Sequence, residues 1–413
     1  MRHLLHHATI LRAVALCLLL LSQPANAATH LVVSEANLDS VNIAVSHSGK
    51  QPACSASDSN FFSPSLHLGA PGGGPFVQPL NSEMDEAAVY LKAARMGGGI
   101  YMHLPYFVPL ATCKNVIFEV RARHILWDGE WHTGSLSIPA VAVKDKSIFF
   151  TNETAPLMRG ASYFDASFDR PTLDRLEPAF ASIIGFYKKV LHAEPMRGIG
   201  VVAAIARNKG NYSGFGGDAL NIIRMSYDNP TAQQLQTVGD VFPSTFAHEL
   251  GHKLQSEQLF AQPLARHIVE GSADFLKIVV LHNAGLIDES QAKARILKAV
   301  ADCVALAGPA TLRDKARRGA IGFREPYDCG MVYYFTSYYA SGLDGAAYVD
   351  VLRKALSGAR HYGREPALCL YFERSCRNQR LNGVTGNLTQ LKIQTAWLQG
   401  QLARRPLPVL TPR

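Results

Sequence analysis

The sequence lacks several features that would place it in other classes of protein. No apolar run after residue 21 is long enough to cross a membrane as a helix, so we expect no stable membrane insertion. Basic residues are not interleaved with aromatic ones, and the basic stretch 313–318 is broken by Asp314 and Ala316, so we expect no nucleic-acid partner. No two cysteines have the CxxC spacing of thiolate metal ligands. A hydrophobic content of 47% with 18% charged residues is instead ordinary for a globular enzyme.

The start of the chain has the pattern of a secretory signal peptide, residues 1–27. Arg2 and Arg12 flank an apolar run at 13–21, and the tripeptide 25–27 (Ala-Asn-Ala) is a small-x-small cleavage site. The apolar run is too short to span a bilayer as a mature helix. We therefore predict an exported protein, located in the periplasm or secreted.

The cysteines support an oxidising compartment. One of the seven lies in the predicted signal peptide, which leaves six in the exported chain. An even number in such a compartment favours disulfides, here up to three, although buried free thiols are an alternative. Fifteen pairings of six cysteines are formally possible. Proximity along the chain favours Cys369–Cys376, which leaves Cys54–Cys113 and Cys303–Cys329 as the remaining pairs.

Residues 246–252, Phe-Ala-His-Glu-Leu-Gly-His, are the segment most suggestive of chemistry. On a helix, His248 and His252 lie one turn apart on the same face, so both imidazoles can point at one metal ion. Glu249 is close enough to hydrogen-bond a water on the metal without being a ligand, as a general base requires. The segment therefore supplies two zinc ligands and a base.

A catalytic zinc takes three protein ligands and leaves a fourth position to water, so a third ligand is required. A third His six residues after His252 is excluded, because Gln258 stands there and Gln255 replaces the Gly that this arrangement needs. A second helical pattern follows and places Glu270 and Asp274 on one face. Glu270 can be the third ligand, and Asp274 can accept the free ring N–H of a ligating His.

The two segments resemble the gluzincin metallopeptidases, which include thermolysin, aminopeptidase N and the glycyl aminopeptidases. That family has a His-Glu-x-x-His helix followed by Glu-x-x-x-Asp, matched here by residues 248–252 and 270–274. A His-Glu-x-x-His segment alone also arises by chance, but the second segment at this separation favours a zinc site. The resemblance implies Zn2+ as the cofactor, His248, His252 and Glu270 as its ligands, Glu249 as the base and Asp274 as the support of a ligand His.

The hydrophobic pattern changes along the chain. Short alternating segments before residue 155 indicate strands, among them 115–127 and 136–143, with a turn at Asp128-Gly129 and a long loop at 51–79. Helical spacing begins near residue 170. A buried strand is expected at 199–206, a glycine-rich turn at 210–217 and a returning strand at 218–225.

We predict an α+β fold with a β-rich N-terminal domain in front of a zincin-like catalytic domain and a helical C-terminal part. The zincin-like domain would hold a small sheet and the active-site helices. The predicted segments are a signal peptide at 1–27, the β-rich domain at 28–155, the catalytic domain at 156–285, the helical region at 286–402 and a tail at 403–413.

The family resemblance also suggests residues that contact the substrate. In gluzincins the strand before the zinc helix forms a sheet edge to which substrate backbone adds, although an ordinary hairpin is an alternative here. The motif that holds a substrate amino terminus in the aminopeptidase branches is absent, so amino- and endopeptidase specificity both stay open. Tyr327-Asp328-Cys329-Gly330 resembles their Tyr-x-x-Gly, which implies that Tyr327 stabilises the oxyanion unless it only packs. The candidates for substrate binding are Gly216, Gly217, Asp218 and Ala219.

Together these features predict a zinc-dependent peptidase that hydrolyses a peptide or protein substrate with a zinc-bound water activated by Glu249. Two alternatives stay open: an exported zinc-binding protein with a relict site, and a hydrolase of esters or epoxides. The retained Glu249 speaks against a relict site, because a structural zinc site does not use a carboxylate beside an open metal position.

Overall fold

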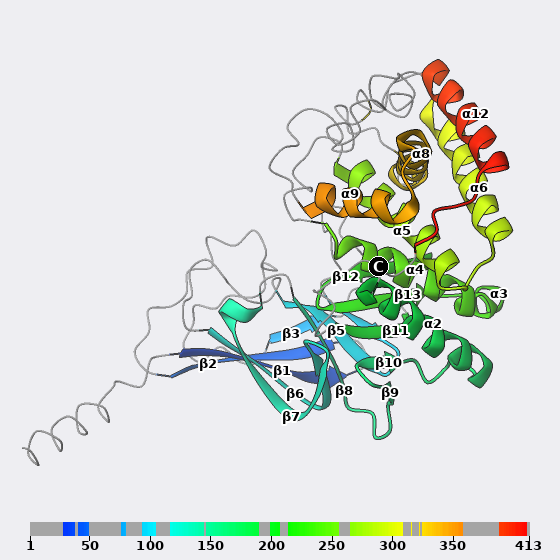
Figure 1. The fold of residues 1–413 in the computed structure, drawn as a ribbon. Coiled ribbons are helices and arrows are strands. Elements are labelled where there is room, and N and C mark those ends of the chain that lie inside the picture. Colours follow the sequence, from blue (N-terminus) through cyan, green and yellow to red (C-terminus); the bar gives the residue numbers. More distant parts are fainter. Residues whose placement is uncertain are drawn as a thin grey trace, which may run out of the picture. The chain divides into compact units, whose positions relative to one another are not determined.

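The structure of the chain is a computed structural model with two sheets and a set of helices, a mixed α/β protein (Figure 1). It forms two units. The first holds the described residues up to Leu157 with Ala206 and Leu220–Ile222, and the second holds the others. The described residues are 28–37, 40–48, 76–79, 93–104, 116–143, 146–189, 199–206, 214–255, 265–308, 315, 322, 324–357 and 388–410.

The first unit is built on an eight-stranded sheet with the order β3-β2-β1-β6-β8-β5-β4, and β7 pairs with β6 off this path. β1 runs parallel to β6, and the other neighbours pair antiparallel. The strands are β1 (Ala28–Asn37), β2 (Ser40–Ser48), β3 (Phe76–Pro79), β4 (Ala93–Met96), β5 (Gly99–His103), β6 (Val116–Trp127), β7 (Glu130–Pro139) and β8 (Ser147–Thr151).

The alternating pattern of β6 explains why this sheet has a buried face. Phe118 and Val120 are fully buried, whereas Arg121 and Arg123 are exposed. The predicted turn after β6 is confirmed at Asp128-Gly129, whose φ angles of 48° and 78° are those of a tight hairpin. The strand expected at 136–143 is shifted, because β7 starts directly after this turn and η3 (Ala140–Ala142) follows it.

The second unit contains a five-stranded sheet with the order β12-β13-β11-β10-β9. β11 is parallel to β10, whereas β12 and β13 are antiparallel. Every residue of β11 is buried, as its continuous apolar sequence predicts. The strands are β9 (Leu157–Arg159), β10 (Ser162–Phe164), β11 (Gly200–Ala206), β12 (Gly214–Ala219) and β13 (Ile222–Asp228).

The helices of the second unit pack in a chain of contacts. α4 packs against α2, α5 and β12, and α5 packs against α8, which α6 and α12 also contact (Figure 1).

Within the described residues no helix has the length and apolar character needed to cross a membrane. The helices are α2 (Arg170–Lys189), α3 (Ala232–Gln236), α4 (Val238–His252), α5 (Ala265–Asn283), α6 (Glu289–Ala307), α8 (Glu325–Ser341), α9 (Gly345–Ser357) and α12 (Leu388–Arg404).

Two predicted loops are wrong. Gly214, Gly216 and Gly217 belong to β12 rather than to a turn, and the chain reverses at Leu220 and Asn221 before β13; residues 210–213 of the predicted turn lie outside the described residues. Asn221 stabilises the reversal, because its Oδ1 accepts from the Ser147 N–H at 2.6 Å and its amide donates to the Ser147 carbonyl at 2.9 Å. Residues 76–79, expected in the long loop, form β3.

One predicted disulfide lies within the described residues. Cys303 of α6 is bonded to Cys329 of α8, so this pairing is confirmed. The predicted signal peptide lies outside the described residues. So do the four cysteines of the other predicted pairs, Cys54, Cys113, Cys369 and Cys376.

Candidate metal centre

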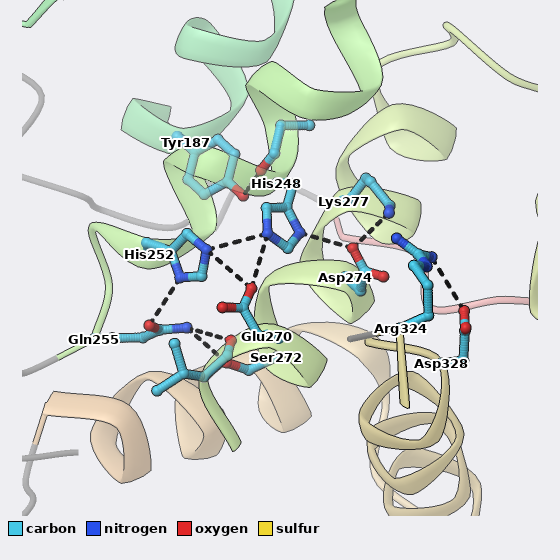
Figure 2. Close-up of polar contacts among 12 residues, drawn as sticks. Tyr187, His248, His252, Gln255, Glu270, Ser272, Asp274, Lys277, Arg324 and Asp328 are labelled. Carbon is cyan, nitrogen blue, oxygen red and sulfur yellow. Dashed lines mark hydrogen bonds and ion pairs between the residues drawn. The ribbon is translucent and has the colours of Figure 1, made fainter. Parts of the chain in front are cut away.

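Helix α4, which carries the first motif, is held by packing against α2. Phe246 is fully buried and packs on Phe180, with ring centroids 4.5 Å apart. The Tyr187 hydroxyl donates a hydrogen bond to the Ala247 carbonyl at 2.8 Å (Figure 2). These contacts fix the helical turn that starts at His248.

The three predicted ligands come together between α4 and α5. The Nε2 atoms of His248 and His252 are 3.1 Å apart. Oε2 of Glu270 lies 3.2 Å from Nε2 of His248 and 3.5 Å from Nε2 of His252 (Figure 2). Three donor atoms from two helices therefore converge on one point.

This geometry and donor set fit a single metal ion. A tetrahedral ion with ligands at about 2.0–2.1 Å separates two ligand atoms by about 3.3–3.4 Å. The three separations of 3.1, 3.2 and 3.5 Å lie around that value. Two imidazole nitrogens with one carboxylate oxygen suit zinc and other late first-row metal ions, whereas magnesium and calcium prefer oxygen ligands alone. The group His248, His252 and Glu270 can therefore hold a metal ion.

Asp274 orients the first histidine. Its Oδ1 lies 2.7 Å from Nδ1 of His248. Because an ionised carboxylate only accepts, Nδ1 carries a hydrogen, and in the neutral ring that binds a metal ion the lone pair is on Nε2, which faces Glu270. Lys277 donates to the same Oδ1 at 2.5 Å, a contact that sequence reasoning missed although the i, i+3 spacing on α5 indicates it.

The electrostatics of the group favour a positive charge at its centre. Burial alone would lower the pKa of His248, but the surrounding carboxylates, Asp274 foremost, raise it to about 9. Burial alone would raise the pKa of Glu270, but hydrogen bonds from His248 and His252 hold it well below its usual range. A divalent cation supplies the charge that these carboxylates favour.

Glu249 is buried beside the ligands and lies against β12. Burial raises the pKa of its carboxyl above the ordinary value, which suits a group that both takes and returns a proton. A Cβ on Gly217 would lie only 2.6 Å from Oε1 of Glu249. Because Gly217 has no side chain, there is room beside β12 for the carboxylate of Glu249.

The predicted substrate-binding residues lie in β12, which stands at one end of the five-stranded sheet as described. Gly216 and Gly217 present backbone rather than side chains. Asp218 is different, since its carboxylate is buried and accepts from Nε of Arg224 at 2.7 Å. A substrate amine would have to displace this buried guanidinium, so the pairing disfavours Asp218 as an amine anchor. Ala219 ends the strand, opposite Ile223 of β13.

Tyr327, at the start of α8, lies next to the ligands. Its ring stacks on that of His248, with centroids 5.7 Å apart and an interplanar angle of 26°. Burial first, and then the nearby carboxylates, raise the pKa of Tyr327, so the phenol stays protonated. α8 approaches this closely because Gly271 meets Gly330, where a Cβ on Gly271 would be 2.4 Å from Cα of Gly330.

Gln255 joins the site just beyond the end of α4. Its Oε1 lies 3.0 Å from Nδ1 of His252 (Figure 2). Sequence reasoning used Gln255 only to exclude a third histidine. The i, i+3 spacing from His252 was the one signal for this contact.

No family model matches this chain, and no curated protein matches it. The functional proposal therefore rests on the geometry and chemistry of the site.

Proposed function

We propose that this protein is a zinc-dependent peptidase with a gluzincin-type site on a zincin-like catalytic unit. The observation that carries the proposal is the convergence of three donor atoms, from His248, His252 and Glu270, beside the buried carboxylate of Glu249. We call this unit zincin-like because it has a small sheet whose edge strand, β12, packs against α4, the helix that carries His248 and His252. Export, implied by the predicted signal peptide, is supported by the Cys303–Cys329 disulfide.

Hydrolysis of a peptide bond joins a water oxygen to the carbonyl carbon and breaks the C–N bond. Zinc held by the three ligands would lower the pKa of a bound water to about 7 and polarise the scissile carbonyl. Glu249 takes the proton that the attacking water loses and gives it to the leaving nitrogen. Its raised pKa supports both transfers, because burial brings the pKa of this carboxyl closer to the range in which a group both accepts and donates a proton.

Two further groups would serve the reaction. The protonated phenol of Tyr327 can donate to the oxygen that becomes negative in the transition state, and such a donor contributes roughly 2–4 kcal/mol. Alternate residues of β12 within 216–219 point their backbone groups away from β13 and can pair with an extended substrate. Recognition through backbone fits a peptide better than an ester or epoxide, which lacks the repeating N–H and C=O groups.

The buried Glu249 favours a working site over a relict one. Burial raises the pKa of Glu249, which shows that the ionised carboxylate is disfavoured at this position. A role in the reaction would explain why an ionisable residue stands there despite this cost in stability. A binding protein that holds zinc only for structure would be more stable with an apolar residue at this position.

The decisive experiment compares purified wild-type protein with the Glu249→Gln variant. Each is loaded with zinc and incubated with a mixed peptide library, with and without a chelator, and products are identified by mass spectrometry. We expect the wild type to cleave, the chelator to stop cleavage and added zinc to restore it. The Gln variant should keep its zinc and its fold but lose nearly all hydrolysis.

A matched control is Glu289→Gln, which makes the same change on the exposed start of α6 and should cleave like the wild type. Wild-type rates in the Glu249 variant would overturn the assigned base. Trimmed amino termini among the products would indicate an aminopeptidase, and internal cuts an endopeptidase.

Metal content tests the ligand set independently of the reaction. Glu270→Ala should lower the zinc that copurifies with the protein, because two imidazoles alone hold the ion weakly. Elemental analysis of the variant beside Glu289→Ala measures this. Equal zinc in both variants would contradict Glu270 as a ligand.

A further inference from the structure

His252 has a different partner from His248. Its Nδ1 lies 3.0 Å from Oε1 of Gln255. The amide nitrogen of Gln255 donates to the Val269 carbonyl at 2.7 Å and to Oγ of Ser272 at 2.9 Å (Figure 2). The side chain therefore bridges from the end of α4 to α5.

The Val269 carbonyl determines how this bridge is oriented. A carbonyl oxygen only accepts, so the NH2 group of Gln255 has to face it and the amide oxygen has to face His252. An amide oxygen also only accepts, so Nδ1 of His252 carries the hydrogen. In the neutral ring that binds a metal ion, the lone pair of His252 is then on Nε2, the atom that faces Glu270.

From this chain of contacts we propose that Gln255 is a positioning residue of the metal centre. It holds His252 in the tautomer that a metal ion requires and ties it to the turn of α5 that carries Glu270. The proposal rests on the metal site proposed above.

The place of Val269 in α5 gives the bridge its second effect. Val269 directly precedes Glu270, and Ser272 follows two residues later. One amide therefore holds the ring of His252 and the turn of Glu270 together, at a separation of 3.5 Å between Nε2 and Oε2. Without the amide, the packing of α4 on α5 would remain, but the ring of His252 would lose its hydrogen-bonded link to the turn of Glu270.

A neutral amide suits this position better than a second carboxylate. The site already contains the carboxylates of Glu249, Glu270 and Asp274, and a glutamate at 255 would add a fourth negative charge. One of its oxygens would also face the Val269 carbonyl, so two acceptors would meet without a hydrogen. Glutamine orients the ring and avoids both effects.

The test measures zinc affinity rather than peptide cleavage. Gln255→Met keeps the length of the side chain and removes the amide, and Gln255→Leu is the second variant in case the first does not fold. Ser272→Ala is the matched control, because it removes one hydrogen bond from the same buried network and leaves Gln255 bound to Val269 and His252. Dissociation constants come from competition with a chromophoric zinc chelator, and thermal unfolding of the metal-free proteins checks the fold.

We expect Gln255→Met to bind zinc roughly 10–100-fold more weakly than the wild type, and Ser272→Ala to change affinity less than about threefold. A second readout is the ring N–H signals of zinc-loaded protein with 15N-labelled histidine. The wild type and Ser272→Ala should show a protected Nδ1–H for His252, and Gln255→Met should lose that one signal. A residue that only joined two helices would not change it.

The outcomes separate this inference from the proposed function. Tight zinc binding by the wild type with unchanged affinity in Gln255→Met would overturn the role of Gln255 and leave the metal site intact. Equal weakening in Ser272→Ala would overturn it too, because the effect would then belong to the helix contact as a whole. No zinc binding by the wild type would overturn both proposals.

Discussion

Replacing Gly217 by alanine tests whether Glu249 is the base and whether its place depends on β12. The added Cβ would lie 2.6 Å from Oε1 of Glu249, 3.0 Å from Cδ and 3.1 Å from Cγ. These atoms are the end of a flexible side chain, so the carboxylate can move aside and the protein should still fold. Gly216→Ala is the comparison, because among the described residues its Cβ would meet Nη2 of Arg224 alone, at 3.9 Å.

The size of the effect follows from this geometry. Ordinary contact starts at 3.4 Å, so a carboxylate oxygen at 2.6 Å has to withdraw by about 0.8 Å. A displacement of about 1 Å in a reacting group can reduce a rate by about 10²-fold, which corresponds to about 2.7 kcal/mol. Glu249 is not a ligand, so zinc content should not change, and the loss should appear in kcat.

Steady-state kinetics of both alanine variants, with zinc content measured on the same samples, provides the assay. Both variants replace a glycine by alanine in the same strand, so the change in backbone conformational freedom is shared and the difference reports the contact with Glu249. The double variant Gly217→Ala/Glu249→Gln should be no slower than Glu249→Gln alone, because a base that is absent cannot be displaced. A kcat of Gly217→Ala within about threefold of Gly216→Ala would refute the reasoning.

Three further predictions concern stability. Burial lowers the pKa of His267 to about 3 from an ordinary 6.5, so the unfolded state binds more protons and stability falls as pH drops from 6.5 towards 3. Between pH 7.5 and 5 this group alone removes about 2 kcal/mol from the free energy of unfolding. Urea unfolding of His267→Leu should lack that part of the pH dependence. The same change of unfolding free energy with pH in the variant and the wild type would contradict the prediction. Gly271→Ala should lower the free energy of unfolding by about 1–3 kcal/mol, because its Cβ meets the backbone of Gly330, and an unchanged urea midpoint would exclude this. Replacing Cys303 and Cys329 by serine opens a link between residues 26 apart and should lower stability by about 3–4 kcal/mol, judged by unfolding beside the oxidised wild type.

Local patterns predicted the parts of the fold that depend on neighbouring residues. The β6–β7 hairpin follows from Asp128-Gly129 between two alternating segments. The parallel pairing of β1 with β6 joins segments far apart in the chain, and no local pattern specifies it. The glycines of β12 indicated a turn, because a sequence does not show that Gly217 makes room for Glu249 of α4, three elements later.

In the site, too, local patterns predict the features within one helix but not the contacts between elements. Helical spacing places His248 above His252 and Glu270 above Asp274, and the family resemblance indicated that the two segments meet. The structure brings His248, His252 and Glu270 together as a group that could hold a metal ion. The roles of Gly217 and Gln255 depend on contacts between α4 and other elements. Only the folded chain brings these residues to Glu249 and His252.

The close contacts between helices explain why the ligand pattern alone does not guarantee a working site. Gly251 of α4 lies against Ala273 of α5, where a Cβ would be 3.0 Å from Cα of Ala273. Ligand distances in a metal site are met within about 0.2 Å, whereas this contact would have to open by about 0.4 Å to reach the ordinary 3.4 Å. An alanine at position 251 would therefore move α5, and Glu270 with it, by more than the site tolerates. The candidate metal centre thus depends on the absence of a Cβ at Gly251 as well as on His248, His252 and Glu270.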